Sequence, residues 1–319
     1  DSVRNEYTLG LSIVSGRSTL FIGGPGTAKT STVLQYLAKQ DKATTMFKKL
    51  SFSSATTPSI FQRQIEGSVE KRQGRTFGPP GGKKMLVFID DISMPQYNEW
   101  GDQITLEIVR QQMEFGGMYN LDKPGEFKFI KDLLFMGAML QPGGGKNDLP
   151  NRAKRHFHIM NVTLPSAASI HQIFGSLLKA QFDPESEARV PEVWETSELL
   201  VEMTIQIWEA VKKKMLPTPA KFHYVFNMRD LSRVFQGVLA VPHDSINTGG
   251  TRGTEGTYTV APPSTLVNVW KHECERVFND KLTNYKDKDV CTGAIEETIK
   301  EVFDEAVVAG IPEDQELLM

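Results

Sequence analysis

The sequence has little cysteine, no long apolar run and no large excess of charge of either sign. Only Cys274 and Cys291 occur among its 319 residues, so a disulfide framework is excluded and a reducing compartment is expected. No apolar run approaches the roughly 18–20 residues that cross a bilayer, and no secretory signal opens the chain. The net charge of −3 creates no global field that recruits nucleic acid or an anionic membrane. We therefore expect neither of these as a partner.

The composition is globular, in a chain of about two-domain length. Hydrophobic residues make up 39% and charged residues 24%, which argues against wholesale disorder. The 319 residues exceed the roughly 100–200 of a single domain. Because the first residue is Asp1 and not methionine, we expect the sequence to be an internal piece of a longer chain.

Short apolar runs that alternate with helical patterns predict a parallel sheet. The runs occupy residues 18–23, 47–52, 85–89, 133–140 and 157–164. The third run is unbroken and ends at two aspartates, as expected of a parallel strand buried on both faces. Helical spacing follows the first run at 29–39 and precedes the fourth at 103–113. We therefore expect an α/β domain over 1–164 with a five-stranded parallel sheet and right-handed crossovers.

Two segments with turn-forming residues interrupt this alternation. Residues 71–84 (KRQGRTFGPPGGKK) are basic and predict a loop or hairpin insert. Residues 116–129 carry turn dipeptides and predict a second insert before the fourth strand. The first insert is more consistent with a solvated surface than with a nucleic-acid site, because the rest of the chain is not basic.

After residue 164 the pattern becomes helical. Apolar residues at successive i+4 positions over 199–215 predict a long amphipathic helix capped by Thr196 or Ser197. Further helical patterns lie at 227–239, 266–282 and 294–308, and the composition of 243–263 is that of a long loop. We therefore expect a smaller α-helical domain over 165–319.

A glycine-rich segment between the first strand and the next helix carries the strongest chemical signal. Residues 23–30 (GGPGTAKT) match the phosphate-binding pattern G-x-x-x-x-G-K-[ST], except that Ala28 replaces the last glycine. A methyl group there is tolerable if the residue is already helical. Lys29 is expected to reach the β- and γ-phosphates and Thr30 to bind Mg²⁺. The expected nucleotide-binding residues are Gly23, Gly24, Pro25, Gly26, Thr27, Ala28, Lys29, Thr30 and Ser31. The alternative is a strand-to-helix turn that is merely rich in glycine.

Two carboxylates at the end of the third strand are expected to complete this site. Asp90 would lie at the carboxyl edge of the sheet, beside the loop, and hold Mg²⁺ through water. Asp91 would lie where a general base polarises the attacking water. Most NTPases of this type use glutamate, and aspartate is shorter by roughly 1.3–1.5 Å of reach, which puts fast hydrolysis in doubt. The alternative is a pair of solvated carboxylates at a strand end.

The order of phosphate loop, acid-ended strand and helical second domain resembles that of AAA+ ATPases. More closely, the chain is similar to one AAA+ module of a dynein heavy chain, over nearly its whole length. The matching stretches include FIDDISMP (88–95), NEWGDQIT (98–105), PGGGKNDLPNRAKRHF (142–157) and FNMRDLSRVFQGVL (226–239). GTAKT, FIDD and PGGGKND are most similar to the third module of axonemal, outer-arm-type heavy chains.

The resemblance implies further site residues. Arg155 resembles an arginine finger that acts on the neighbouring module's nucleotide, with Arg152 as the other candidate; either would stabilise charge on a γ-phosphate. The alternative for both is a surface arginine paired with a carboxylate. Arg229 resembles the sensor-2 arginine that contacts nucleotide from the helical lid. The sensor-1 asparagine of the family is missing after the fourth strand, and Gln141 is the nearest substitute.

The implied function is that of a slow or regulatory ATPase module. It would bind ATP or ADP with Mg²⁺ and tune a microtubule motor through movement of its lid. The implied partners are the neighbouring AAA+ modules of the same heavy chain, with microtubules contacted indirectly through the parent motor. The implied location is cytoplasmic or cytoskeletal, in a ciliary or flagellar axoneme. Two alternatives remain, namely a free-standing AAA+ remodelling ATPase and a structural ring segment that holds non-exchanging nucleotide.

Overall fold

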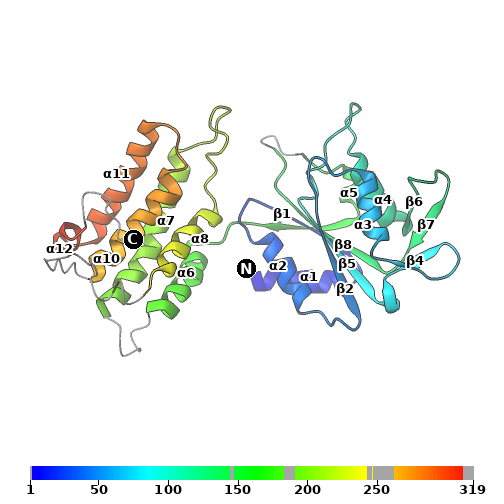
Figure 1. The fold of residues 1–319 in the computed structure, drawn as a ribbon, viewed down its shortest axis with the longest axis horizontal. Coiled ribbons are helices and arrows are strands. Elements are labelled where there is room, and N and C mark those ends of the chain that lie inside the picture. Colours follow the sequence, from blue (N-terminus) through cyan, green and yellow to red (C-terminus); the bar gives the residue numbers. More distant parts are fainter. Residues whose placement is uncertain (1, 144–146, 183–190, 243–245, 247–261, 312–319) are drawn as a thin grey trace. The chain divides into compact units, whose positions relative to one another are not determined.

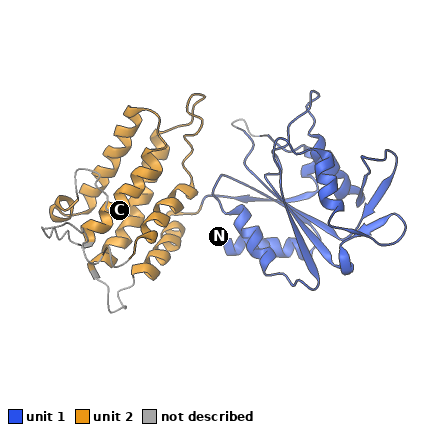
Figure 2. Cartoon of the chain, in the orientation of Figure 1, with its two compact units in different colours: residues 1–164 blue, residues 165–319 orange. Residues whose placement is uncertain are grey.

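The computed structural model describes residues 2–143, 147–182, 191–242, 246 and 262–311 (Figure 1). Its contacts divide the chain into two compact units, 1–164 and 165–319 (Figure 2). The first unit is α/β and the second is helical, so the predicted fold class is confirmed. In the part of the chain that is described, no helix is long and apolar enough to cross a bilayer.

Unit 1 is built on a five-stranded parallel sheet, as the sequence predicts. The strands are β1 (Ser18–Gly23), β2 (Thr45–Ser51), β5 (Lys84–Asp90), β8 (Leu133–Met139) and β9 (Phe157–Val162). They are ordered β2-β5-β8-β1-β9. Residues 85–89 of β5 are fully or almost fully buried, because β5 lies inside the sheet with helices over both faces. The carboxyl ends of β1, β8 and β5 therefore meet at one edge.

Helices cover both faces of this sheet (Figure 1). On one face lie α1 (Ser2–Val14) and α2 (Lys29–Ala38), packed around Phe21 and Phe88. On the other lie α3 (Pro58–Glu66), α4 (Ile104–Phe115) and the short α5 (Asn151–Lys154). The sequence did not predict α1, whose outer face carries exposed apolar side chains at Val3, Tyr7, Leu11 and Val14. Apolar residues on both faces obscure the helical period.

The two inserts form one small sheet. It contains β3 (Glu70–Lys71) and β4 (Thr76–Gly78) from the first insert, and β6 (Gly117–Tyr119) and β7 (Phe127–Ile130) from the second. The strand order is β3-β4-β7-β6, and β4 pairs with β7 in parallel. A 3₁₀ turn, η1 (Pro80–Gly82), leads from this sheet to β5. The sequence predicted both inserts but not their pairing, which joins segments some fifty residues apart.

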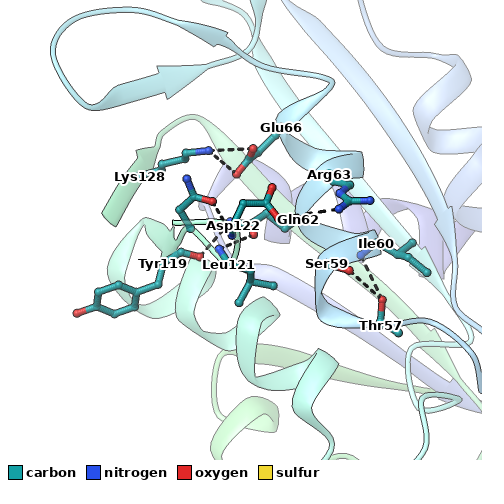
Figure 3. A network of polar contacts seen from close by, with 11 residues as sticks. Thr57, Ser59, Ile60, Gln62, Arg63, Glu66, Tyr119, Leu121, Asp122 and Lys128 are labelled. Carbon is teal, nitrogen blue, oxygen red and sulfur yellow. Dashed lines mark hydrogen bonds and ion pairs between the residues drawn. The ribbon is translucent and has the colours of Figure 1, made fainter. Parts of the chain in front are cut away.

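Polar contacts fix the second insert to α3 (Figure 3). The buried Gln62 side chain donates to the carbonyl of Tyr119 at 3.0 Å and accepts from the N–H of Leu121 at 3.0 Å. One turn further on, the Lys128 ammonium lies 3.0 Å from both carboxylate oxygens of Glu66. A buried amide that uses both its donor and its acceptor specifies one position of the hairpin along the helix.

Unit 2 is a bundle of helices around an aromatic-rich core. Its helices are α6 (Ala167–Phe182), α7 (Pro191–Lys214), α8 (Met228–Ala240), α10 (Pro262–Cys274), the π-helical η2 (Glu275–Asn279), α11 (Tyr285–Val302) and α12 (Glu305–Ala309). Trp208, Phe235 and Trp270 lie in the core. The loop predicted at 243–263 falls outside the described residues, apart from 246, 262 and 263. Cys274 and Cys291 are buried and unpaired, and burial raises the pKa of both thiols.

The predicted boundaries of three helices in unit 2 are wrong. α7 begins at Pro191, so Thr196 and Ser197 lie inside it and their hydroxyls donate to carbonyls of the preceding turn. A helix-interior hydroxyl can bond its own backbone instead of capping. The pattern at 266–282 is divided between α10 and η2, and the one at 294–308 is interrupted between α11 and α12.

A buried hydrogen bond between two helices of unit 2 generates a stability prediction. The indole N–H of Trp270 donates to the hydroxyl of Thr204 at 2.8 Å, and both side chains are fully buried. Replacing Thr204 with valine leaves this N–H without an acceptor, which costs about 1–3 kcal/mol. We expect Thr204→Val to lower the free energy of unfolding of unit 2 by that amount in denaturant titrations followed by circular dichroism.

Thr298→Val is the matched control. Among the described residues, the hydroxyl of Thr298 bonds only to a carbonyl of its own helix, at Ala294. Its loss should cost well under half as much as the loss of the Thr204 hydroxyl. Equal effects of the two substitutions would show that the inter-helix bond adds nothing.

Candidate functional site

The loop between β1 and α2 closes tightly on itself. A Cβ atom at Gly23 would lie 2.2 Å from the carbonyl oxygen of Val162 on β9, so this position requires glycine. Gly26 has a φ of +79°, which also favours glycine. The Thr27 side chain is buried and donates to the carbonyl of Gly24 at 3.0 Å. Gly23 and Gly26 of the motif thus have structural reasons to be where they are.

Lys29 points into this loop. Its ammonium donates to the carbonyls of Gly23 at 2.8 Å and Gly24 at 2.6 Å, and it lies 3.2 Å from the Thr27 hydroxyl. In this position the Lys29 ammonium adds a positive charge to a turn whose backbone N–H groups can donate hydrogen bonds to a phosphate.

The condition under which a methyl group at position 28 would be tolerable, that the residue is already helical, is not met. Ala28 is the residue before α2 and has φ 61° and ψ 20°, in the left-handed region. Its Cβ approaches a carbonyl oxygen there, which costs roughly 1–2 kcal/mol for an L-residue. The glycine of the common pattern avoids this cost, so the substitution stores backbone strain at the loop.

Thr30 and Asp90 meet at the same edge of the sheet. The Thr30 hydroxyl lies 3.1 Å and 3.2 Å from the two carboxylate oxygens of Asp90. Thr30 lies in the first turn of α2 and Asp90 ends β5, and sixty residues separate them in the chain. A hydroxyl and a carboxylate are hard oxygen ligands of the kind that Mg²⁺ prefers. The donor set therefore fits the expected metal.

Lys49 is a charged neighbour of this pair that the sequence did not reveal. Its ammonium lies 3.8 Å from Asp90 Oδ2, and its side chain is 39% exposed. It stands on β2, where Ser51 is the residue aligned with Asp90. Successive side chains of a strand point to opposite faces, so Lys49 lies on the face of β2 away from that of the core-facing Leu50. Only the pairing of β2 with β5 brings this lysine to the site.

The residues after β5 and β8 lie at the same edge. Asp91 is exposed and has a φ of 52°. The segment after it is held by the fully buried Gln103, whose amide donates to the carbonyls of Ser93 and Pro95. Gln141 is exposed beyond the end of β8, the strand between β1 and β5. Asp91 and Gln141 thus lie at the same edge of the sheet as the loop between β1 and α2.

The two candidate finger arginines lie at the opposite edge. Arg155 precedes β9, whose first residue aligns with the start of β1, so about 20 Å of strand separates Arg155 from the loop. Its guanidinium lies 2.5 Å from Glu114, which also pairs with Arg110. Arg152 is exposed on α5 and has no ion-pair partner among the residues that the structure describes. Neither arginine can serve its own unit's loop.

Arg229 lies in the first turn of α8 in unit 2. Asn227 and Asp230 form a capping box there: the Asn227 side chain accepts from the Arg229 N–H at 2.8 Å, and Asp230 accepts from the Asn227 N–H at 2.8 Å. Asp230 is buried and therefore structural, while Arg229 is exposed. The cap fixes the backbone from which Arg229 projects.

Comparison with known families defines what this fold is. Residues 1–165 match the model of the P-loop containing dynein motor region, and residues 200–309 match that of the AAA+ lid domain. The chain therefore belongs to the family of P-loop-containing dynein motor regions.

Its relatives among curated proteins are dynein heavy chains. It is 51% identical to the gamma chain of the flagellar outer arm of Chlamydomonas reinhardtii, over 98% of this chain and 7% of the relative. It is 47% identical to dynein axonemal heavy chain 5 of Mus musculus, over 96% of this chain and 6% of the relative. The chain thus spans about a fifteenth of the length of these relatives. It is an AAA+ module of the axonemal heavy-chain class.

The left-handed alanine generates a second stability prediction. Ala28→Gly removes the steric cost of that conformation. Glycine also makes the unfolded chain more flexible, which raises the entropy cost of folding by a smaller amount. We expect the free energy of unfolding of unit 1 to rise by about 0.5–1 kcal/mol, measured by denaturant titration. Ala38→Gly, at the right-handed last residue of the same helix, should lower it instead. A loss of stability in both variants would contradict the left-handed assignment.

Proposed function

We propose that unit 1 binds ATP or ADP together with Mg²⁺ through residues 23–31. The assembly of Lys29, Thr30 and Asp90 at one edge of the sheet carries this proposal. Backbone N–H groups of the loop and the Lys29 ammonium would hold the phosphates. Thr30 and Asp90 would hold the metal, and a bound Mg²⁺ would neutralise part of the charge on the phosphate oxygens.

Hydrolysis in this site is proposed to be slow. Asp91 would act as the base with a shorter reach than glutamate, and Gln141 would replace the sensor asparagine. Arg229 would contact the nucleotide from the lid. Arg155 or Arg152 would serve the nucleotide of a neighbouring module, since both lie about a strand length from their own loop. In a ring of modules, each site would then be completed by the next module.

In its parent protein the chain is proposed to be the third module of an outer-arm-type motor ring. The identity of 51% to an outer-arm chain, against 33% to a chain of the inner-arm I1 complex, supports the outer-arm type. The module would relay its nucleotide state to neighbouring modules through its lid and reach microtubules only through the rest of the motor. A ciliary or flagellar axoneme follows from the same likeness.

Two other functions remain as alternatives, and only the first of them is disfavoured. A free-standing remodelling ATPase is disfavoured because the likeness to heavy chains extends over 98% of this chain. A structural ring segment that holds nucleotide permanently differs from a regulatory module only in how fast the nucleotide exchanges. The strain at Ala28 and the short Asp91 are compatible with both.

Substitution of Lys29 tests nucleotide binding. Lys29→Ala removes the charge that the loop presents to the phosphates, and we expect the affinity for ADP to fall about a hundredfold, as measured by isothermal titration calorimetry with Mg²⁺. Lys39→Ala is the control, because Lys39 lies at the far end of the same helix and pairs with Glu6. If Lys29→Ala bound ADP as tightly as the unmodified chain, the site would be wrong.

Exchange separates the regulatory function from the static one. The nucleotide content of the purified chain is measured first, and labelled ATP is then added in excess. Release of the original nucleotide within the experiment supports a regulatory module, whereas tight ADP that never exchanges supports the structural segment.

The position of Lys49 predicts how the site depends on magnesium. Its positive charge beside Asp90 opposes a divalent cation at the same carboxylate. We expect Lys49→Met to lower the Mg²⁺ concentration that gives half-maximal ADP affinity by about threefold or more. Lys48→Met is the matched control, since the neighbouring side chain points to the other face of β2. Equal shifts in both variants would exclude a specific effect of Lys49.

A further inference from the structure

A cavity of about 820 Å³ lies at the edge of the main sheet opposite to the phosphate-binding loop. Its walls come from the amino-terminal ends of β1, β8 and β9 and from the carboxyl-terminal end of α4. These strands are parallel, so their amino-terminal ends share one edge while residues 23–31 lie at the other. The cavity is therefore not part of the candidate nucleotide site.

Positive charge dominates this cavity. Arg17, Lys131 and Arg155 line it, and of the lining residues only Asp132 carries a carboxylate. That carboxylate is already paired, because Asp132 lies 2.5 Å from the guanidinium of Arg72. Arg17 and Lys131 are exposed and form no ion pair with any described residue. Arg17 and Lys131 thus have no paired carboxylate among the residues that the structure describes.

A second carboxylate near the cavity is also neutralised. Glu114 pairs with both Arg155 and Arg110. Desolvation acts to raise the pKa of Glu114, but the charges of these arginines outweigh it and the pKa is lower than usual. Desolvation, together with the charge of Arg155, also lowers the pKa of His156 in the cavity wall. His156 therefore adds little positive charge at neutral pH, and the excess charge comes from Arg17 and Lys131.

Two buried polar side chains in the wall have unused hydrogen-bonding capacity. Ser18 is 9% exposed, and its hydroxyl accepts from the N–H of Phe135 at 3.3 Å, so its proton is available to a ligand. Gln112 is 3% exposed; its amide donates to the carbonyl of Ile130, while its oxygen has no partner among the described residues. The Ser18 hydroxyl can therefore donate to an anion in the cavity, whereas the oxygen of Gln112 is closed off from solvent and is not available to a ligand there.

We propose that this cavity is a second anion site, which binds a phosphate group through Arg17, Lys131 and Ser18. Cationic and hydroxyl donors that converge on one space are the usual means of holding phosphate, because charge-assisted hydrogen bonds to it are strong. The ligand is free inorganic phosphate or the terminal phosphate of a nucleotide. The site stands independently of the nucleotide site at the other edge of the sheet.

Calorimetric titration of the full 319-residue chain with inorganic phosphate tests this site. Lys29→Ala is introduced first, so that the phosphate-binding loop contributes little, and ionic strength is held constant. We expect one phosphate to bind this variant. Adding Arg17→Ala and Lys131→Ala should weaken binding about tenfold or more, since each removes a charged donor. Both side chains are exposed, so the core is preserved.

A matched lysine and a second titrant complete the experiment. Lys71→Ala, on the exposed β3, should leave phosphate binding unchanged. If ATP binds the Lys29→Ala variant more tightly than phosphate does, and this binding also needs Arg17 and Lys131, the ligand is a nucleotide phosphate; equal or weaker binding assigns free phosphate. The proposal is overturned if Lys29→Ala alone abolishes phosphate binding, or if the two cavity substitutions do not weaken it. ADP binding by the unmodified chain tests the nucleotide site separately.

Discussion

The parallel register of the five strands is the constraint on which the chemistry of unit 1 depends. β1 pairs with β8 and β9, and β8 pairs with β5. Residues that follow parallel strands emerge at one edge, so Thr30 and Asp90 reach hydrogen-bonding distance although sixty residues separate them. The same register collects Arg17 and Arg155 at the opposite edge. One set of backbone hydrogen bonds therefore positions both the nucleotide site and the cationic cavity.

Backbone strain is concentrated where the chain enters or leaves these strands. Among the described residues, Ala28, Asp91 and Asp132 are the non-glycine residues with positive φ. Ala28 lies in the phosphate loop just before α2, Asp91 follows β5 and Asp132 precedes β8. Each such conformation costs roughly 1–2 kcal/mol, less for aspartate, whose side chain can bond locally. Strain of this kind is sustained by the surrounding sheet and gathers at functional sites, and these three residues flank the nucleotide site or the opposite cavity.

The sequence predicts what depends on local pattern and misses what depends on pairing. The five apolar runs specify the main strands, because a buried parallel strand is apolar along its whole length. The sheet shared by the two inserts is not predictable in this way, since β4 and β7 join segments from opposite sides of α4. Lys49 is missed for the same reason, because only its register with β5 brings it to Asp90. The conformation of Ala28 is missed because the motif gives spacing and not dihedral angles.

The two candidate finger arginines differ in their ion-pair partners, which the sequence alone does not reveal. The resemblance favours Arg155 and keeps Arg152 as the alternative, and the structure gives the two arginines different surroundings. Arg155 is held by Glu114, so it could reach a neighbour's phosphate only by exchanging a carboxylate for a more highly charged oxyanion. Arg152 projects from α5 without such a partner in the described chain and needs no exchange. A contact through Arg155 would therefore couple the neighbour's nucleotide to Glu114 and the end of α4, whereas a contact through Arg152 would leave that helix unchanged.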